Sequence, residues 1–203
     1  RDQPRSRGLG DVYKRQLSKR YFIMIILASK SPRRKELLSL ITDDFTVDSA
    51  EVDETLPCDI EPDKAVEYLS KIKAQPFRES GKIVIGADTV VAIDGKILGK
   101  PKNEKDAFLM LKNLSGKEHS VFTGVTVIKN DKEVTFSVQT KVKFFELDDR
   151  EIEDYISSGE PFDKAGAYGI QGKGSLFVEK IDGDYFNVVG LPISRLARQL
   201  KSI

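Results

Sequence analysis

The sequence has almost none of the residues that build disulfides and metal–thiolate centres. Cys58 is its only cysteine and His119 its only histidine. One cysteine excludes an internal disulfide and a cysteine cluster for zinc, and it fits a reduced, cytoplasmic setting. Neither a metal site of His and Cys ligands nor a serine triad can be built without His119, which we interpret as a structural residue.

Long apolar runs and an excess of one charge are also missing. No segment approaches the roughly 18 consecutive apolar residues of a membrane-spanning helix, so no membrane partner is expected. The net charge of the 203 residues is only +1, which argues against a general nucleic-acid binder. The motif G-x-x-x-x-G-K-[ST] is absent from the sequence, which argues against a P-loop kinase or ATPase.

The first 23 residues differ from the rest of the chain. They are basic, rich in Gly and Arg and without an apolar period, and Met24 stands directly before the apolar run 25–27. We expect residues 1–23 to be a non-native or disordered extension and residues 24–203 to form a single domain. The alternative is a signal peptide, although no small-residue cleavage site follows the apolar run.

The most informative feature of the sequence is the segment LASKSPRR at 27–34. It follows an apolar run that predicts a buried strand and precedes a helix-forming segment. Ser31 is a good N-cap and Pro32 suits the first helical position, so Arg33 and Arg34 fall in the first turn. Two cations there oppose the helix dipole unless an anion binds. The segment therefore predicts a phosphate site; alternatively, both arginines point into water.

Asp88 interrupts an apolar strand region that extends from 82 to 93. A carboxylate is costly to bury there unless it is paired or binds a metal, and it is also a candidate general base. The alternative is a carboxylate that caps a turn, since we expect residues 86–89 to break the region into two strands. Thr89, beside it, either holds a ligand or simply suits a strand.

Glu51 and Asp53 alternate with an apolar residue, so an extended chain would place both carboxylates on one side. Together with Asp88 they would suit Mg²⁺ or Mn²⁺, which prefer oxygen ligands. The alternative is an acidic loop that is only solvated.

Two lysines and a glutamine complete the candidate ligand-binding residues. Lys100 lies between Gly99 and a proline that holds its backbone extended, and Lys73 lies at the end of a predicted helix. A fixed lysine suits a phosphate, although both settings also occur without any ligand. Gln171, in the glycine-rich segment 159–172, carries an amide able to read a base edge; the alternative is a flexible surface loop.

Strands and helices interleave along the chain, which predicts an α/β fold with a mixed sheet. We expect helices over 61–73, 103–114, 148–156 and 193–201, a hairpin of strands 120–129 and 133–145, and a final strand pair that turns at 182–184.

Seven segments together resemble the motifs of the Maf family of nucleoside triphosphate pyrophosphatases. They occur in the family's order and span residues 25–200, nearly the whole chain. The segments are LASKSPRRKELL at 27–38, EVDE at 51–54, KA at 73–74, GADTVV at 86–91, GKP at 99–101, HSVFTG at 119–124 and the glycine-rich stretch 159–172.

The resemblance implies a Maf/ITPase-like α/β fold, with a twisted mixed β-sheet flanked by helices and two lobes around a central cleft, usually as a homodimer. It implies hydrolysis of nucleoside triphosphates between the α and β phosphates with a divalent cation, Mg²⁺ or Mn²⁺. The implied substrates are dTTP, UTP and modified pyrimidine nucleotides, and the implied role is removal of unwanted nucleotides from the pool.

The resemblance also implies roles for particular residues. Asp88 matches the family's proton acceptor and Glu51 an acidic position near the metal, although the sequence leaves open whether Asp88 activates a water or holds the metal. The phosphate-binding positions match Ser29, Arg33, Arg34, Lys73 and Lys100. The specificity positions of the dTTP/UTP subgroup match Arg33, Thr89 and Gln171.

Two other functions remain as alternatives. A non-catalytic nucleotide-binding regulator of cell division would keep the arginines without needing Asp88. A nucleic-acid-binding module built on the basic N-terminus would show salt-dependent DNA binding that is lost when residues 1–23 are deleted. Residues 1–20 carry seven Lys or Arg against two Asp, so the remainder is net negative at about −4, which argues against this second alternative.

Overall fold

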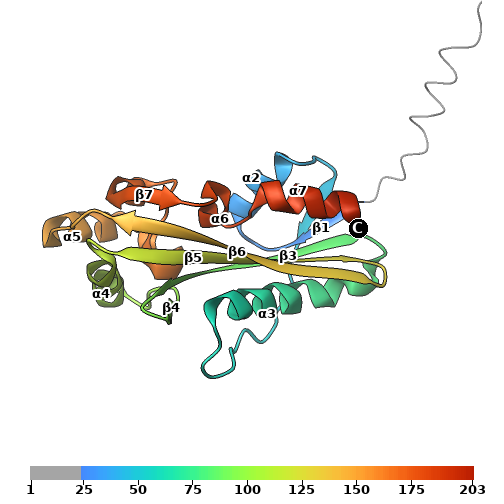
Figure 1. The fold of residues 1–203 in the computed structure, drawn as a ribbon, viewed down its shortest axis with the longest axis horizontal. Coiled ribbons are helices and arrows are strands. Elements are labelled where there is room, and N and C mark those ends of the chain that lie inside the picture. Colours follow the sequence, from blue (N-terminus) through green and yellow to red (C-terminus); the bar gives the residue numbers. More distant parts are fainter. Residues whose placement is uncertain (1–23) are drawn as a thin grey trace, which may run out of the picture.

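Seven strands form one twisted, mixed sheet in the computed structural model, which describes residues 24–203 (Figure 1). The strands, in sheet order, are β2 (Phe45–Asp48), β1 (Ile25–Ala28), β3 (Ile83–Ile93), β5 (Glu118–Lys129), β6 (Lys132–Phe144) and β7 (Val178–Asp182), with β4 (Lys96–Leu98) paired to β3. The β1 strand runs parallel to β2 and β3, and the other pairs are antiparallel. The predicted mixed α/β sheet is confirmed.

The helices cover both faces and one end of this sheet. Figure 1 shows α3 on one face, α2, α6 and α7 on the other, and α4 and α5 at one end of the long strands. Their bounds are α2 (Pro32–Ser39), α3 (Pro62–Ala74), α4 (Glu104–Leu114), α5 (Asp149–Ser157), α6 (Tyr185–Val189) and α7 (Ile193–Ser202), with short 3₁₀ helices η1 (Gln75–Ser80), η2 (Glu160–Asp163), η3 (Ala165–Ala167) and η4 (Lys173–Phe177). The result is two lobes that share the long strands β3, β5 and β6.

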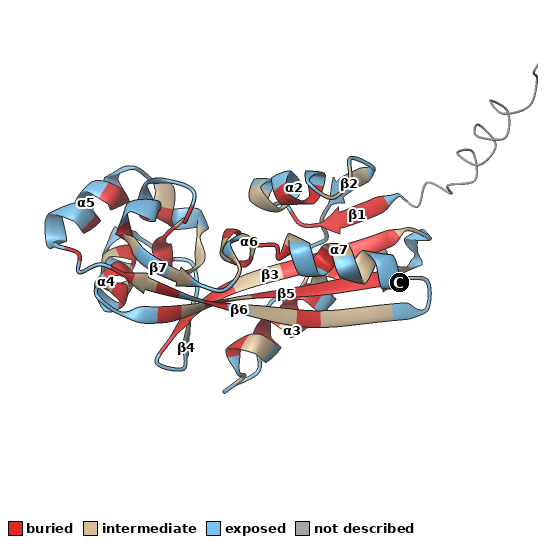
Figure 2. Cartoon of the chain, turned by 45° about the horizontal axis from the view of Figure 1, so that its top comes forward, coloured by how far each residue is buried: buried red, intermediate tan, exposed pale blue. Residues whose placement is uncertain are grey.

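Each lobe has its own apolar cluster. Leu111 of α4 and Phe144 of β6 belong to one cluster, and Leu38 of α2 and Leu196 of α7 belong to the other; all four are fully buried. Burying each such side chain contributes roughly 1.5–3 kcal/mol. Figure 2 shows the buried residues concentrated along the central strands and the inner faces of the helices.

The backbone of α3 packs directly against the backbone of two sheet strands, β3 and β5. A Cβ on Gly86 would lie 2.2 Å from the carbonyl oxygen of Ser70, and one on Gly124 would lie 2.2 Å from that of Val66. Only glycine permits this approach. The prediction that residues 86–89 break the strand region is therefore wrong: β3 is continuous, and Gly86 makes room for α3 instead of turning the chain.

The predicted final strand pair is also wrong. The chain forms β7 and then the short helix α6, because Asp184 caps that helix by accepting the backbone N–H of Phe186 at 2.8 Å. The other predicted helices and the 120–145 hairpin are confirmed, with ends that differ by one or two residues. The expectations for residues 1–23 lie outside the described residues.

The helices found between residues 24 and 203 are all too short or too polar to cross a membrane.

Candidate functional site

A cavity of about 1030 Å³ lies between the two lobes, over the middle of β3. Its wall combines the β1–α2 turn, the 49–56 segment, the end of α3, the loop after β4 and the glycine-rich segment after α5. All nine predicted site residues line this cavity: Ser29, Arg33, Arg34, Glu51, Lys73, Asp88, Thr89, Lys100 and Gln171. The fold thus collects in one place residues that the sequence spreads over more than two thirds of its length.

The first turn of α2 positions Arg34 in the cavity wall. Ser31 caps the helix as predicted, its hydroxyl accepting the backbone N–H of Arg34 at 3.5 Å. The Arg34 guanidinium donates to the carbonyl oxygen of Gly190 at 2.9 Å, to Ser29 Oγ at 3.2 Å and to Thr89 Oγ1 at 3.0 Å. Burial lowers the pKa of Arg34, but a guanidinium remains charged at any physiological pH. Arg34 is therefore a fixed cation, and the alternative that it points into water is wrong.

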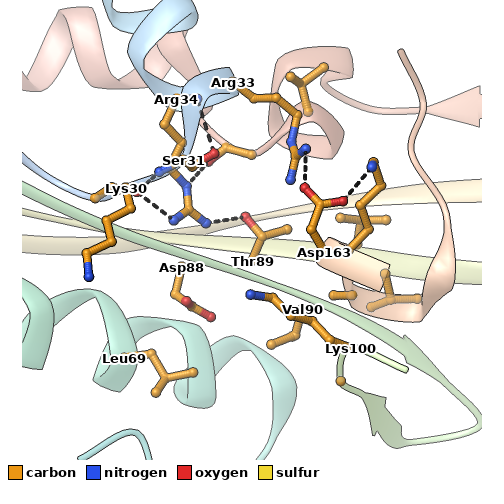
Figure 3. A pocket seen from close by; sticks show the side chains of 18 of the residues that line it. Lys30, Ser31, Arg33, Arg34, Leu69, Asp88, Thr89, Val90, Lys100 and Asp163 are labelled. Atoms are coloured by element: carbon orange, nitrogen blue, oxygen red, sulfur yellow. Dashed lines mark hydrogen bonds and ion pairs between the residues drawn. The ribbon is translucent and has the colours of Figure 1, made fainter. Parts of the chain in front are cut away.

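Arg33 is bonded to a carboxylate that lines the same cavity. Its Nη1 donates to Asp163 Oδ2 at 3.0 Å, and Lys164 Nζ donates to the other carboxylate oxygen at 2.6 Å (Figure 3). Partial burial acts in the opposite direction, but the bonds from Lys164 and Arg33 lower the pKa of Asp163. Arg33 thus has a carboxylate partner that a phosphate group would have to replace.

Asp88 lies in the middle of β3 and points into the cavity (Figure 3). Its Oδ1 is ion-paired with Lys73 Nζ, and Lys73 also contacts Glu54 Oε2 at 3.1 Å. Only 14% of the Asp88 side chain is exposed, so the pairing offsets the cost of burying the carboxylate. The alternative that Asp88 caps a turn is wrong. Figure 3 shows the Lys100 side chain directed toward the same space.

The acidic segment near residue 51 does not form a strand. Glu51 lines the cavity but Asp53 does not, and the Asp53 carboxylate accepts the backbone N–H of Thr55 at 3.0 Å. The expectation that both carboxylates face one side is wrong, and Glu54 takes the second place at the cavity. Within residues 24–203 no three His, Cys, Asp or Glu side chains are grouped as a metal site.

Gln171 lines the cavity from a segment that is packed against Glu160. The Glu160 carboxylate accepts the hydroxyl of Tyr155 at 3.1 Å and the backbone N–H of Lys173 at 2.9 Å. A Cβ on Gly172 would lie 2.2 Å from Glu160 Oε1, so the Glu160 carboxylate packs closely against this glycine. The alternative of a flexible surface loop does not fit this packing.

The cavity wall includes polar groups that the sequence did not predict as site residues, among them Glu54, Asp163, Lys164 and the backbone of Gly190. Glu54 extends the acidic cluster, and Asp163 and Lys164 belong to the glycine-rich segment, so each lay beside a recognised signal. Gly190 acts through its carbonyl oxygen, which every residue has, and no sequence signal could have identified it.

His119 lies outside the cavity wall, in the core of one lobe. It is 3% exposed, and its Nε2 lies 2.8 Å from the hydroxyl of Tyr168. Burial lowers the pKa of His119 to about 4, so the ring is neutral at physiological pH. These contacts agree with its interpretation as a structural residue.

Comparisons with known proteins place the chain in a family. Residues 24–203 match the family described as "Maf-like protein". A protein of Bacillus cereus (strain AH187) named "dTTP/UTP pyrophosphatase" is 56% identical over 179 residues, which cover 87% of this chain and 94% of the relative. A protein of the same name from Bacillus pumilus (strain SAFR-032) is 52% identical over 180 residues, which cover 88% and 95%.

Solved structures agree on the fold. The Ham1 protein of Staphylococcus aureus matches with a TM-score of 0.53 at 15% identity, covering 88% of this chain and 98% of its own. A HAM1 protein from Coxiella burnetii matches with a TM-score of 0.51 at 12% identity, covering 89% and 100%. The family match and the two Bacillus relatives show that the chain belongs to the Maf family.

Proposed function

We propose that the chain hydrolyses dTTP and UTP between the α and β phosphates, releasing a nucleoside monophosphate and pyrophosphate. The observation that carries this proposal is the arrangement of one paired carboxylate, Asp88, inside a cavity that six basic side chains also line. The relatives named dTTP/UTP pyrophosphatase, at 52–56% identity, support the choice of substrate.

The cations would distribute the charge of the triphosphate. Arg33 and Arg34 lie at the N-terminus of α2, where the helix dipole adds partial positive charge. Lys73 lies at the end of α3, on the other face of the sheet from α2, and it lines the cavity together with Lys100. Charge that develops on the leaving pyrophosphate would then meet fixed cations, which is the main source of catalysis in phosphoryl chemistry.

Asp88 would act on the attacking water. As the water oxygen bonds to the α phosphorus, its proton passes to the Asp88 carboxylate, and the bond from that phosphorus to the oxygen bridging the β phosphate breaks. Pyrophosphate leaves with that bond's electron pair. Lys73 Nζ is ion-paired with the Asp88 carboxylate, so binding of phosphate would draw Lys73 away and release the carboxylate.

A divalent cation would be held by carboxylates and substrate together. Glu51, Glu54 and Asp88 offer oxygen ligands at the cavity wall, and Mg²⁺ is usually held by one or two carboxylates plus phosphate oxygens and water. These donors fit a metal that enters with the nucleotide. When bound, such an ion would neutralise phosphate charge.

A homodimer is also proposed, in line with the family resemblance. The side chains of Phe145 and Leu176 are both exposed, and the backbone N–H of Phe145 donates at 2.9 Å to the carbonyl of Phe177, the residue after Leu176. Light scattering coupled to size-exclusion chromatography would give the mass, and a monomer at micromolar concentration would contradict the proposed dimer.

Product analysis tests the proposed reaction. The full chain is incubated with each common NTP and dNTP plus Mg²⁺ or Mn²⁺, and the nucleotides are separated by chromatography. We expect UMP and dTMP with pyrophosphate, and little turnover of purines. Diphosphate with phosphate would contradict cleavage between α and β. Binding without any turnover would favour the non-catalytic regulator.

A further inference from the structure

Thr123 lies directly behind the cavity wall and is fully buried. Its hydroxyl donates to the carbonyl oxygen of Asn187 at 2.9 Å, and its oxygen also lies 2.9 Å from the hydroxyl oxygen of Thr89. Thr89 is half-buried and lines the cavity, and it accepts a hydrogen bond from Arg34. A chain of hydrogen bonds thus runs from Arg34 through Thr89 and Thr123 to the backbone of α6.

The direction of this chain follows from counting protons. A hydroxyl has one proton to donate and two lone pairs to accept with. Thr123 gives its proton to a carbonyl, which can only accept, so Thr123 must accept the proton of Thr89. Thr89 therefore has no proton left for a ligand. Arg34 takes one of its lone pairs, and the remaining lone pair makes Thr89 an acceptor toward the cavity.

Ser29, which also accepts a hydrogen bond from Arg34, has the opposite hydrogen-bonding role toward the cavity. Its oxygen accepts from Arg34 Nη1 at 3.2 Å and from the backbone N–H of Ser31 at 3.3 Å. Both lone pairs are used, and no acceptor for its proton is found among residues 24–203. Ser29 is therefore a donor toward the cavity and suits a phosphate oxygen, which only accepts. Thr89 has no proton left to donate, so it disfavours a phosphate oxygen, which also only accepts.

We propose that Thr123 is a positioning residue for substrate selection: it holds Thr89 as an acceptor, and Thr89 then selects nucleotides whose nucleoside offers a hydrogen-bond donor. This rests on the proposed nucleotide hydrolysis and adds a cause of selectivity to it. The donor is either the N3–H of uracil or thymine, which cytosine lacks, or a sugar hydroxyl. A substrate without the donor would leave a half-buried acceptor facing an acceptor, which is unfavourable.

Thr123→Val tests this role, because valine keeps the shape of threonine and removes the hydroxyl. Thr89 could then turn its own proton toward the cavity and would accept substrates with an acceptor there. The measurement is kcat/KM for UTP against CTP, and for dTTP against its 3′-deoxy analogue. If the donor is on the base, the UTP preference falls by about tenfold, the factor that corresponds to one hydrogen bond. If it is the 3′-hydroxyl, the dTTP preference falls instead.

Thr123→Ser is the matched control, since it keeps the hydroxyl and should keep both wild-type ratios. A Thr123→Val protein that is folded by circular dichroism and shows both wild-type ratios overturns the positioning role, as does an equal loss on all four nucleotides. If Thr123→Val does not fold, Thr89→Val removes the acceptor itself and must lower one of the two ratios; unchanged ratios overturn the idea.

The same assays separate this role from the proposed function. A wild-type chain that releases no pyrophosphate from any of the four nucleotides contradicts the proposed hydrolysis. The ratios are then taken from dissociation constants of the same nucleotides measured by calorimetry. A shift in the binding ratio in Thr123→Val supports the positioning role, and unchanged binding ratios overturn it.

Discussion

The guanidinium of Arg33 and the carboxylate of Asp163 join the two lobes at the cavity wall, with Nη1 3.0 Å from Oδ2. Arg33 belongs to the first turn of α2 and Asp163 to η2, 130 positions later in the chain. A cation expected to bind phosphate is thus already paired with a carboxylate, and nucleotide must compete with that carboxylate for it.

Asp163→Asn should strengthen nucleotide binding slightly. The substitution removes the negative charge that competes for Arg33, but an exposed ion pair is worth only about 0.2–1 kcal/mol. We expect KM for UTP to fall by at most about fivefold with kcat nearly unchanged. Asp149→Asn removes an equivalent charge from an exposed pair with Lys112, away from the cavity, and should leave KM unchanged. A higher KM in Asp163→Asn would contradict the expected competition between the Asp163 carboxylate and the nucleotide for Arg33.

Asp88→Asn should abolish turnover while keeping nucleotide binding. Asparagine has nearly the same shape but is a poor proton acceptor, and removing a general base typically costs on the order of 10²–10⁴ in rate. Calorimetry should show UTP affinity that is equal or tighter, because Lys73 loses its carboxylate partner. Asp94→Asn, in the β3–β4 turn and outside the cavity wall, is the charge-matched control and should remain active. Wild-type turnover in Asp88→Asn would rule out its catalytic role.

Gly86→Ala should destabilise the fold strongly. The added Cβ would lie 2.2 Å from the carbonyl oxygen of Ser70, and helix and strand would have to separate. Overpacking of this kind typically costs 1–3 kcal/mol or more, which thermal melting would report as a fall of several degrees in Tm. Gly99→Ala is the control, because its Cβ would meet nothing within 4 Å. Equal melting temperatures for the two variants would show that the α3 contact can relax.

The burial of His119 should make stability depend on pH. Its pKa is lowered to about 4 by burial, against about 6.5 in the unfolded chain. Between these values the unfolded state binds the proton and the folded state does not, so stability falls as the pH drops from about 6.5 to 4, by up to about 3 kcal/mol.

The comparison with His119→Gln isolates this contribution. Glutamine can still reach the hydroxyl of Tyr168 but does not titrate, so the free energy of unfolding should depend less steeply on pH between about 4 and 6.5. Urea unfolding at half-unit pH intervals gives both curves. Parallel curves for the two proteins would mean that His119 is protonated in the folded state as readily as in the unfolded state.

Sequence signals were sufficient to predict the features that depend only on residues close together in the chain. Ser31 caps α2 and Asn103 caps α4, because the capping hydroxyl or amide and the N–H that it accepts lie three residues apart. The 130–131 turn of the β5–β6 hairpin is equally local. The same reasoning failed at Gly86, since a glycine that makes room for a distant helix is indistinguishable in sequence from one that turns the chain.

The sequence by itself determined which chemical groups this protein can use: two arginines at a helix N-terminus, a carboxylate within an apolar strand, and seven motifs in the order of one family. Only the tertiary structure decided their partners. Arg34 meets the carbonyl of Gly190, Arg33 meets Asp163, and Thr123 sets the polarity of Thr89. Such pairs join segments that the packing of helices on the sheet brings together, and no local preference of the chain specifies a contact of that range.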